Sequence, residues 1–220
     1  WEQKAILFPS DLATQSYFGY SVAVSGSYTI VGASNGRGTA YIFERNAGTG
    51  AWEQKATWTN PDATPANFGY SVAIDGTYAA VGARGKMVNA IVSAGGIYVF
   101  ERITGTWIQT AIIDNPDPVA SDYFGSSVSV NGVFAVVGCY NKDPASKVNA
   151  GSSYLYKRNS STGQREQKTQ WTASDGLAGD QLGISVGISG TVAIMMAGAY
   201  NKAVMGVAGA GGVYVYDVTD

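Results

Sequence analysis

The stretch FGYSVA occupies residues 18–23 and recurs letter for letter at residues 68–73. Looser copies, FGSSVS at residues 124–129 and LGISVG at residues 182–187, continue the series at intervals of roughly 50–60 residues. A period in this range indicates a repeat protein, in which one small structural unit is copied along the chain. We therefore divide the chain into four units with approximate bounds 1–51, 52–106, 107–164 and 165–220.

Each unit contains four short segments that are typical of β-strands. A segment that opens with Trp in three of the units comes first, at residues 1–7, 52–58, 107–113 and 165–171. The Phe-Gly segment follows and ends in a two-residue turn: Ser25-Gly26, Asp75-Gly76, Asn131-Gly132 or Ser189-Gly190. Such turns need positive φ and favour a β-hairpin. A third segment rich in small residues (28–33, 78–83, 134–139 and 192–199) and a fourth with alternating aromatic residues (40–45, 97–102, 153–158 and 213–218) complete the unit.

Four strands repeated in series predict an all-β fold. We expect a β-propeller with four blades of four antiparallel strands, formed as a single domain over residues 1–220. The last segment of the sequence is of the fourth type, and a Trp segment stands at the beginning. We therefore expect Trp1–Leu7 to pair with the last blade and to close the ring. The rival arrangement is an open half-ring that is completed by a second copy or that belongs to a longer chain.

The composition argues against several classes of function. The 220 residues include no histidine and one cysteine, and the formal net charge is −2. Histidine is the commonest catalytic base and metal ligand, so its absence argues against a hydrolase or a transition-metal site. A nucleic-acid partner would require a basic surface, and the net charge of −2 does not indicate one, so we do not expect nucleic-acid binding. The longest apolar run is too short to span a membrane, and no signal-peptide pattern is visible at the first residues. Cys139 lies in the apolar run FAVVGCY, where we expect it to be buried.

The units resemble the FG-GAP repeat, which builds the propeller of integrin α subunits and occurs in many surface and secreted proteins. The resemblance rests on a Phe-Gly pair and a later Gly-Ala pair: Phe18-Gly19 with Gly32-Ala33, Phe68-Gly69 with Gly82-Ala83, Phe124-Gly125 with Gly138-Cys139, and Leu182-Gly183 with Gly198-Ala199. It implies an interaction module that is extracellular or on a cell surface. Two features depart from the family's pattern. The proline of Gly-Ala-Pro is replaced by Ser34, Arg84, Tyr140 and Tyr200, and integrin propellers have seven blades.

The resemblance also raises the question of calcium. Several integrin blades carry an Asp-rich calcium loop between the Phe-Gly strand and the strand that follows it. Here those loops are two-residue turns, and only Asp75 supplies a carboxylate. Since Ca²⁺ needs several oxygen ligands, we do not expect calcium at the family's position, and we assign no cofactor.

Two sets of charged residues recur in loops that share one rim of the expected propeller. Acidic residues precede the Phe-Gly pair, and two units carry a second acid, which makes Asp117, Asp122, Asp175 and Asp180 a candidate cation site. Basic residues follow the third strand: Arg37, Lys86, Lys142 and Lys202. One hypothesis is that these cations converge and bind an anion, such as a sulfated or carboxylated glycan or an acidic patch of a protein. The alternative is that the acids form local turns and pair with the cations.

The sequence favours a non-catalytic binding or assembly scaffold, because no nucleophile–base pair or metal constellation is recognisable and no catalytic residue can be assigned. We expect a protein or glycan partner, and the chain could be one subunit of a larger assembly. A lectin-like carbohydrate-binding propeller is the alternative, and a hydrolase that uses the paired acids is a third hypothesis. Asn159-Ser160-Ser161 is a sequon that predicts glycosylation of Asn159 in a secreted eukaryotic protein.

Overall fold

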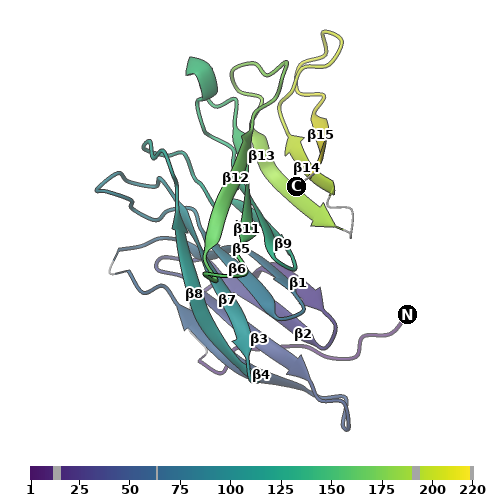
Figure 1. Cartoon of the computed structure of the whole chain (residues 1–220). Coiled ribbons are helices and arrows are strands. Elements are labelled where there is room, and N and C mark those ends of the chain that lie inside the picture. The colour runs from purple at the N-terminus through teal and green to yellow at the C-terminus, as the bar shows by residue number, and fades with distance from the viewer. Residues whose placement is uncertain (12–15, 63, 190–193, 219–220) are drawn as a thin grey trace.

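The computed structural model describes residues 1–11, 16–62, 64–189 and 194–218. The strands within these residues group into four antiparallel sheets, which we number as blades 1 to 4 (Figure 1). Blade 1 contains β1 (Phe18–Ser25), β2 (Tyr28–Ala33), β3 (Thr39–Arg45) and β4 (Trp52–Thr59). Blade 2 contains β5 (Phe68–Asp75), β6 (Tyr78–Ala83), β7 (Gly96–Ile103) and β8 (Thr106–Asp114). Blade 3 contains β9 (Ser127–Asn131), β10 (Phe134–Cys139), β11 (Ser152–Arg158) and β12 (Arg165–Trp171). Blade 4 contains β13 (Leu182–Ser189), β14 (Ile194–Ala199) and β15 (Gly212–Asp217).

The all-β propeller with four blades is confirmed. Within each blade the strands follow one another in chain order, and the Phe-Gly strand lies at one edge of the sheet. In blades 1 to 3 the opposite edge is the first strand of the next sequence unit, so each of these three blades contains strands of two units. The short turn η1 (Pro144–Ser146) lies between β10 and β11. Ser189 ends β13, whereas Gly190 and residues 192 and 193 of the expected third strand lie outside the described residues.

The predicted hairpin turns have the expected backbone conformation. Gly26, Gly76 and Gly132 have φ values of 57°, 56° and 53°, a region that an L-residue adopts only with strain. Each turn joins the Phe-Gly strand to the following strand, and in blade 2 the register runs from Asp75 opposite Tyr78 to Ser71 opposite Gly82. The ladder is irregular between Phe68 and Ser71, which bends the start of the innermost strand.

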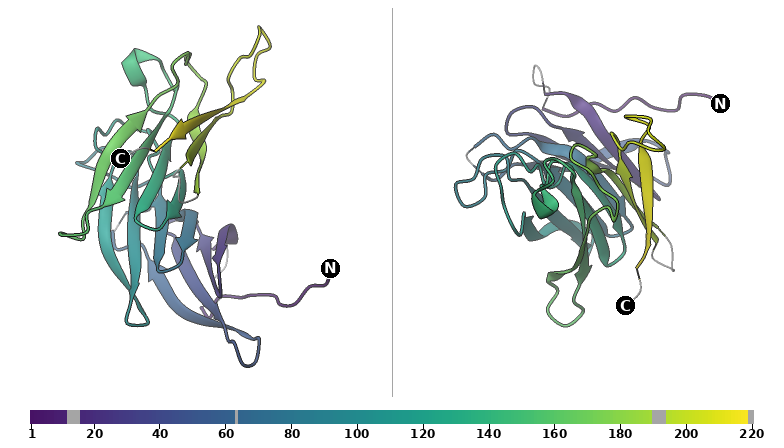
Figure 2. Two further views of the ribbon diagram at one scale, coloured as in Figure 1. Left: turned by 45° about the vertical axis from the view of Figure 1, so that its right-hand side comes forward. Right: turned by 90° about the horizontal axis from the view of Figure 1, so that it is seen from above.

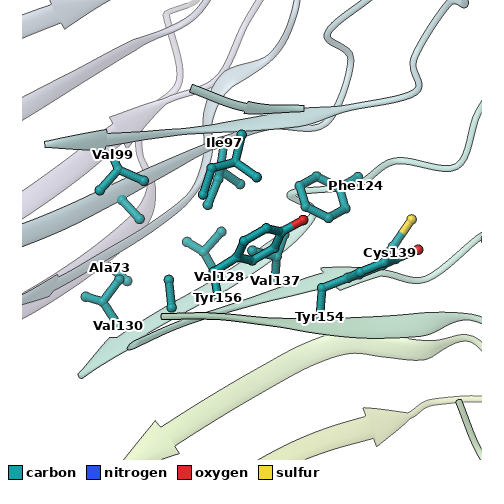
Figure 3. Packing of buried hydrophobic residues seen from close by; sticks show 13 residues of the cluster. Ala73, Ile97, Val99, Phe124, Val128, Val130, Val137, Cys139, Tyr154 and Tyr156 are labelled. Carbon is teal, nitrogen blue, oxygen red and sulfur yellow. The ribbon is translucent and has the colours of Figure 1, made fainter. Parts of the chain in front are cut away.

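The blades are held together by apolar side chains between neighbouring sheets. Every blade has a leading face, which points toward the next blade along the chain, and a trailing face, which points toward the previous one. Between blades 2 and 3, Ile97 and Val99 of the leading face pack with Phe124, Val128 and Val130 of the trailing face (Figure 3). Phe124 is fully buried, and burying a side chain of this size stabilises a fold by about 1.5–3 kcal/mol.

A close backbone contact accompanies this apolar packing. The hydroxyl of Ser71 donates a hydrogen bond to the carbonyl oxygen of Gly125 in the next blade, at 2.8 Å. A Cβ placed on Gly82 would lie 2.1 Å from that same oxygen, so only glycine allows this approach. Blades 1 and 3 repeat the arrangement, with Ser21 bonded to Gly69 and Ser127 bonded to Gly183. The Phe-Gly turn of one blade is therefore seated on the small-residue strand of the blade before it.

The predicted closure of the ring by Trp1–Leu7 is not what the structure shows. The N-terminal segment forms no strand, and the described part of blade 4 has three strands and a free outer edge at β15. Leu7 packs against the core of blade 1, and the amide of Ser10 donates to the side chain of Gln54. These contacts hold the segment beside blade 1, away from β15. The four blades follow an open arc with blades 1 and 4 at its two ends (Figures 1 and 2).

Candidate functional site

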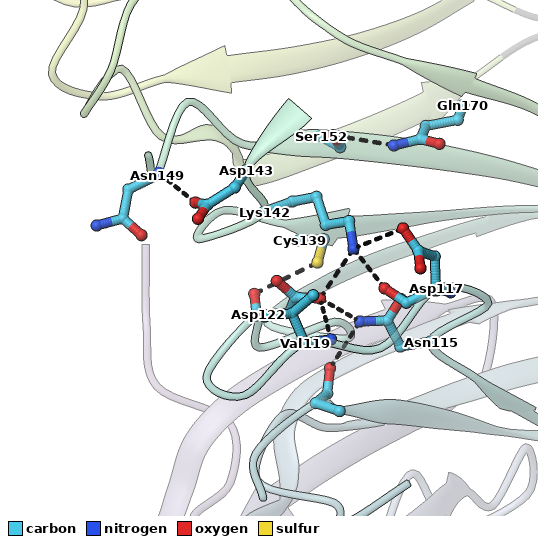
Figure 4. A network of polar contacts seen from close by, with 11 residues as sticks. Asn115, Asp117, Val119, Asp122, Cys139, Lys142, Asp143, Asn149, Ser152 and Gln170 are labelled. Atoms are coloured by element: carbon cyan, nitrogen blue, oxygen red, sulfur yellow. Dashed lines mark hydrogen bonds and ion pairs between the residues drawn. The ribbon is translucent and has the colours of Figure 1, made fainter. Parts of the chain in front are cut away.

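The recurring spacing of acids and bases along the chain produces ion pairs at one rim of the propeller. In blade 3 the ammonium of Lys142 lies 3.1 Å from Oδ2 of Asp122 and 3.2 Å from Oδ2 of Asp117 (Figure 4). It also donates a hydrogen bond to the backbone carbonyl of Asp117. The side chains of Lys142 and Asp122 are buried, whereas that of Asp117 is exposed. Burial opposes the charge on Lys142, but the hydrogen bonds and charges of the two aspartates outweigh it and raise the pKa of the ammonium.

The other units repeat the pairing with variations. In blade 2, Lys86 lies 3.4 Å from Asp62 and 3.1 Å from Asp114. In blade 4, Lys202 lies 2.9 Å from Asp175 and 3.8 Å from Asp180. Arg37 of blade 1 donates instead to the carbonyl oxygen of Asn60. Hydrogen bonds from Tyr214 and Lys202 lower the pKa of the exposed Asp175.

This geometry favours a structural role for the predicted basic and acidic sets. The four basic side chains bind groups of their own chain. Lys86 and Lys142 are buried as well, so an external anion would have to displace the carboxylates already paired with them. The space between Asp117 and Asp122 is filled by the ammonium of Lys142. No cluster of three or more metal-binding side chains occurs within residues 1–11, 16–62, 64–189 and 194–218.

Two buried asparagines complete these ion-pair sites and were not singled out in the sequence. The side-chain amide of Asn115 donates to Oδ2 of Asp122 at 2.8 Å, and its oxygen accepts from the amide of Asp117. Asn60 holds the equivalent loop of blade 2, where its oxygen accepts from the amide of Asp62. The shared triplet Asn-Pro-Asp, at residues 60–62 and 115–117, was the available signal, because Asn before such a turn commonly bonds backbone groups two residues on.

A second group of side chains on this rim has the composition of a binding surface. We call it the tyrosine–arginine cluster; it consists of Tyr20, Tyr70, Arg84, Tyr123 and Tyr140. The guanidinium carbon of Arg84 lies 3.8 Å from the ring centroid of Tyr70 and 5.2 Å from that of Tyr123. One of its terminal nitrogens donates to the hydroxyl of Tyr140 at 3.3 Å. The rings of Tyr123 and Tyr140 are stacked with centroids 5.6 Å apart.

The cluster joins three blades at the start of the inner strands and the end of the strands beside them. Tyr20 of blade 1 lies 5.0 Å from Tyr70 of blade 2 between ring centroids, and it is 51% exposed. Burial, followed by the hydrogen bond with Tyr20, raises the pKa of Tyr70, so its hydroxyl stays neutral at ordinary pH. No ion pair between Arg84 and a carboxylate is found among the described residues. Within these residues the guanidinium thus contacts aromatic rings and a tyrosine hydroxyl instead of a carboxylate.

The sequence contained a signal for this cluster that was not used. Tyr20 and Tyr70 both follow the Phe-Gly pair, and Arg84 and Tyr140 both stand where the family pattern has proline. Only the packing of successive blades brings the two positions together, because they belong to different strands and different units.

The remaining sequence predictions concern residues outside the ion pairs and the tyrosine–arginine cluster. Asn159 lies in the turn between β11 and β12, where its amide donates to Glu166 and its oxygen accepts from the amides of Ser161 and Thr162. Glycosylation of Asn159 stays a prediction. Cys139 is buried, as expected, and its thiol donates weakly to the carbonyl oxygen of Asp122 at 3.3 Å. Burial raises the pKa of this thiol. The described residues contain no helix of the length and apolarity that a membrane span requires.

Four similar blades, seated on one another through Phe-Gly turns, define a repeat β-propeller. The family profile described as FG-GAP repeat matches residues 1–43, 52–100, 107–156 and 166–216, and the chain therefore belongs to the FG-GAP repeat family. A search of curated proteins finds no significant match. Among solved structures, the crystal structure titled as the computationally designed Ika4 protein is similar, with a TM-score of 0.51 and 14% identity over 94% of each chain. At this identity the likeness concerns the fold alone.

Proposed function

We propose that this protein is a non-catalytic binding scaffold, secreted or displayed at a cell surface, that contacts a protein partner through the tyrosine–arginine cluster. The observation that carries the proposal is the stack of Arg84 between Tyr70 and Tyr123, with Tyr20 exposed beside it. Tyrosine and arginine are, together with tryptophan, the residues most enriched at the energetic centres of protein interfaces. Membership of the FG-GAP repeat family supports an interaction role and an extracellular or surface setting.

The ion pairs of the same rim support the proposal indirectly. They fix the loops that flank the cluster, so its side chains are held on a rigid frame and lose little conformational freedom on binding. Arg84 carries a positive charge beside aromatic rings, and an acidic or aromatic patch on the partner would complement it.

The test is a comparison of three proteins as bait for the extracellular and surface proteins of the source organism. The wild-type chain and the Arg45→Ala variant should retain the same specific partner, since Arg45 is an exposed arginine at the end of β3. The Arg84→Ala variant should lose it. With the purified partner, loss of an interface centre should weaken binding by about 30-fold or more. Equal binding by all three proteins would refute the assignment of the site.

A glycan array with the same three proteins tests the lectin-like alternative. Binding to a defined glycan that Arg84→Ala abolishes and Arg45→Ala preserves would place a carbohydrate site at the cluster and would replace the protein partner in the proposal. Turnover of that glycan by the wild-type chain would contradict the non-catalytic role.

A further inference from the structure

The two ends of the arc expose surfaces that are buried everywhere else in the molecule. On the trailing face of blade 1, Val22 and Val24 are 66% and 68% exposed. Their equivalents in blade 2, Val72 and Ile74, are buried against blade 1. A sheet face of this kind loses stabilisation in water because its apolar area remains hydrated.

The leading face of blade 4 shows the same contrast. Val213 and Val215 of β15 are 66% and 61% exposed. Strand register places them where β3 of blade 1 has Ala40 and Ile42, which are fully buried against blade 2. The described structure thus has an uncovered leading face on blade 4 and a trailing face on blade 1 that is uncovered at Val22 and Val24. The rest of that trailing face, which includes Tyr41 and Phe43, is covered by Leu7 and Phe18, so docking would require the N-terminal segment to leave it. Three internal interfaces show how these two kinds of face fit together.

A hollow on blade 4 lies where the internal interfaces hold a Phe-Gly turn. It has a volume of about 600 Å³, and its lining includes Ser185, Gly198 and Gly211. In blades 1 to 3 the residues equivalent to Ser185 and Gly198 contact the carbonyl oxygen of the next Phe-Gly glycine. The hollow therefore has the groups that receive a Phe-Gly turn.

The matching turn is present at the other end of the arc. Gly19 has φ of 90°, close to the 84° of Gly69, and no atom lies within 4 Å of a Cβ placed on it. A Cβ on Gly69 would instead meet the carbonyl oxygen of Thr39 at 2.5 Å. The Phe18-Gly19 turn thus keeps the conformation of a seated turn and contacts no preceding blade in the described structure.

The N-terminal segment adds a second, independent match. Trp1–Ala5 repeats the letters WEQKA of Trp52–Ala56, and the latter residues form the outer strand of the blade that precedes their own unit. By this equivalence, when blade 1 of one molecule docks through its trailing face onto blade 4 of another, residues 1–7 of the first lie at the free edge of β15 of the second. An exposed strand edge readily pairs with a strand of another chain.

From these matches we propose that the partner at both ends is a second copy of this chain, which docks blade 1 onto blade 4 of its neighbour and pairs residues 1–7 with β15. A head-to-tail contact of this type generates a ring when its rotation closes. Two copies that meet at both ends cover every uncovered leading and trailing face, so the expected product is a ring of two chains.

The first test is the mass of the chain in solution, measured by sedimentation velocity over a range of concentrations. A two-chain species that dissociates on dilution is expected. A chain that remains monomeric at all concentrations would overturn the proposal. This holds both if its own ends meet each other and if they require further blades of a longer polypeptide.

The second test uses two variants that each disrupt one face. Val22→Asp with Val24→Asp, and Val213→Asp with Val215→Asp, should each give folded monomers, because burying unpaired carboxylates should weaken association by about 100-fold or more. An equimolar mixture should recover a two-chain species, since one of its two interfaces is wild-type on both sides. Ile108→Asp, at an exposed apolar position of β8, is the control and should stay dimeric. Dimers unaffected by either double variant would overturn the proposal.

The third test distinguishes copies from self-closure. In the internal pairing of β3 with β4, Ile42 lies opposite Ala56, so Ala5 of one copy should lie opposite Val215 of the other. A chain that carries Ala5→Cys and Val215→Cys should form a covalent dimer under mild oxidation. A cross-link formed only within single chains would overturn the proposal.

Discussion

The ammonium of Lys142 lies 3.1 Å from a carboxylate oxygen of Asp122 in a site where both side chains are almost completely buried. The same carboxylate oxygen accepts from the side chain of Asn115 and from the amide of Val119. The ion pair thus ties the end of β10 to the loop before blade 3. A buried pair of this kind is costly to break on one side, because the remaining charge is left without a partner in a medium that solvates it poorly.

Removing one partner of this buried pair should therefore destabilise the fold more than removing one partner of an exposed pair. Lys142→Met should lower the free energy of unfolding by about 3–5 kcal/mol, as measured by urea denaturation. Lys168→Met removes an exposed pair with Glu166 and should cost under about 1 kcal/mol. The double variant Lys142→Met with Asp122→Asn should recover part of the loss. Equal effects at Lys142 and Lys168 would contradict a structural role for the buried pair.

The phenylalanines of the Phe-Gly pairs should contribute differently to the free energy of unfolding, although they share one position in the repeat. Phe124 is fully buried between blades 2 and 3, and Phe124→Ala should cost about 3–5 kcal/mol. Phe18 is half-buried at the free end of the arc, where it contacts Tyr41 and Phe43 edge-on. Phe18→Ala should cost less than half as much when unfolding is measured at low protein concentration. A larger loss at Phe18 would show that its ring is covered in solution.

Two glycines of the Gly-Ala pairs offer a matched comparison of fold and assembly. A Cβ on Gly82 would meet the carbonyl oxygen of Gly125 at 2.1 Å, so Gly82→Ala should separate blades 2 and 3 and cost about 1–3 kcal/mol or more. On Gly198 the nearest atom is the rotatable hydroxyl oxygen of Ser185, at 2.6 Å. Gly198→Ala should leave unfolding of the monomer nearly unchanged, and it should weaken the head-to-tail contact. Thermal melts and sedimentation of both variants check these outcomes; similar melts would contradict the first part.

Stability should fall on the alkaline side. Burial, followed by a hydrogen bond with Asp11, raises the pKa of Tyr41 to about 12, and the pKa of Lys142 is raised as well. In the unfolded chain these groups lose their protons near pH 10. The unfolded state therefore binds fewer protons than the folded state between about pH 10 and 12, and stability decreases with pH there. Urea midpoints should be flat from pH 7 to about 9 and should drop above it, with a shallower drop in Tyr41→Phe. A flat profile to pH 11 would contradict this.

Much of the fold could be predicted from the sequence because each repeat shows the same pattern of strands and turns. The Phe-Gly copies, the Asp-Gly and Asn-Gly turns and the aromatic strands predicted four antiparallel blades, since hairpins and alternating strands depend on neighbouring residues. The pairing of Lys142 with Asp117 and Asp122 was one of two interpretations that the loop spacing allowed. The sequence could not choose between them, because the choice depends on whether the ammonium is turned inward and buried.

The path of the arc and the tyrosine–arginine cluster were decided only by the tertiary structure. The sequence of Trp1–Leu7 matches that of an outer strand, but the pairing of a strand depends on residues far away in the sequence. Here Leu7 packs on blade 1, and β15 keeps a free edge. The stack of Arg84 on Tyr70 and Tyr123 likewise needs two blades set side by side. Local sequence determined what each blade is, because turns and strand periodicity act over a few residues. The packing of whole sheets determined where the blades end and what their rim presents.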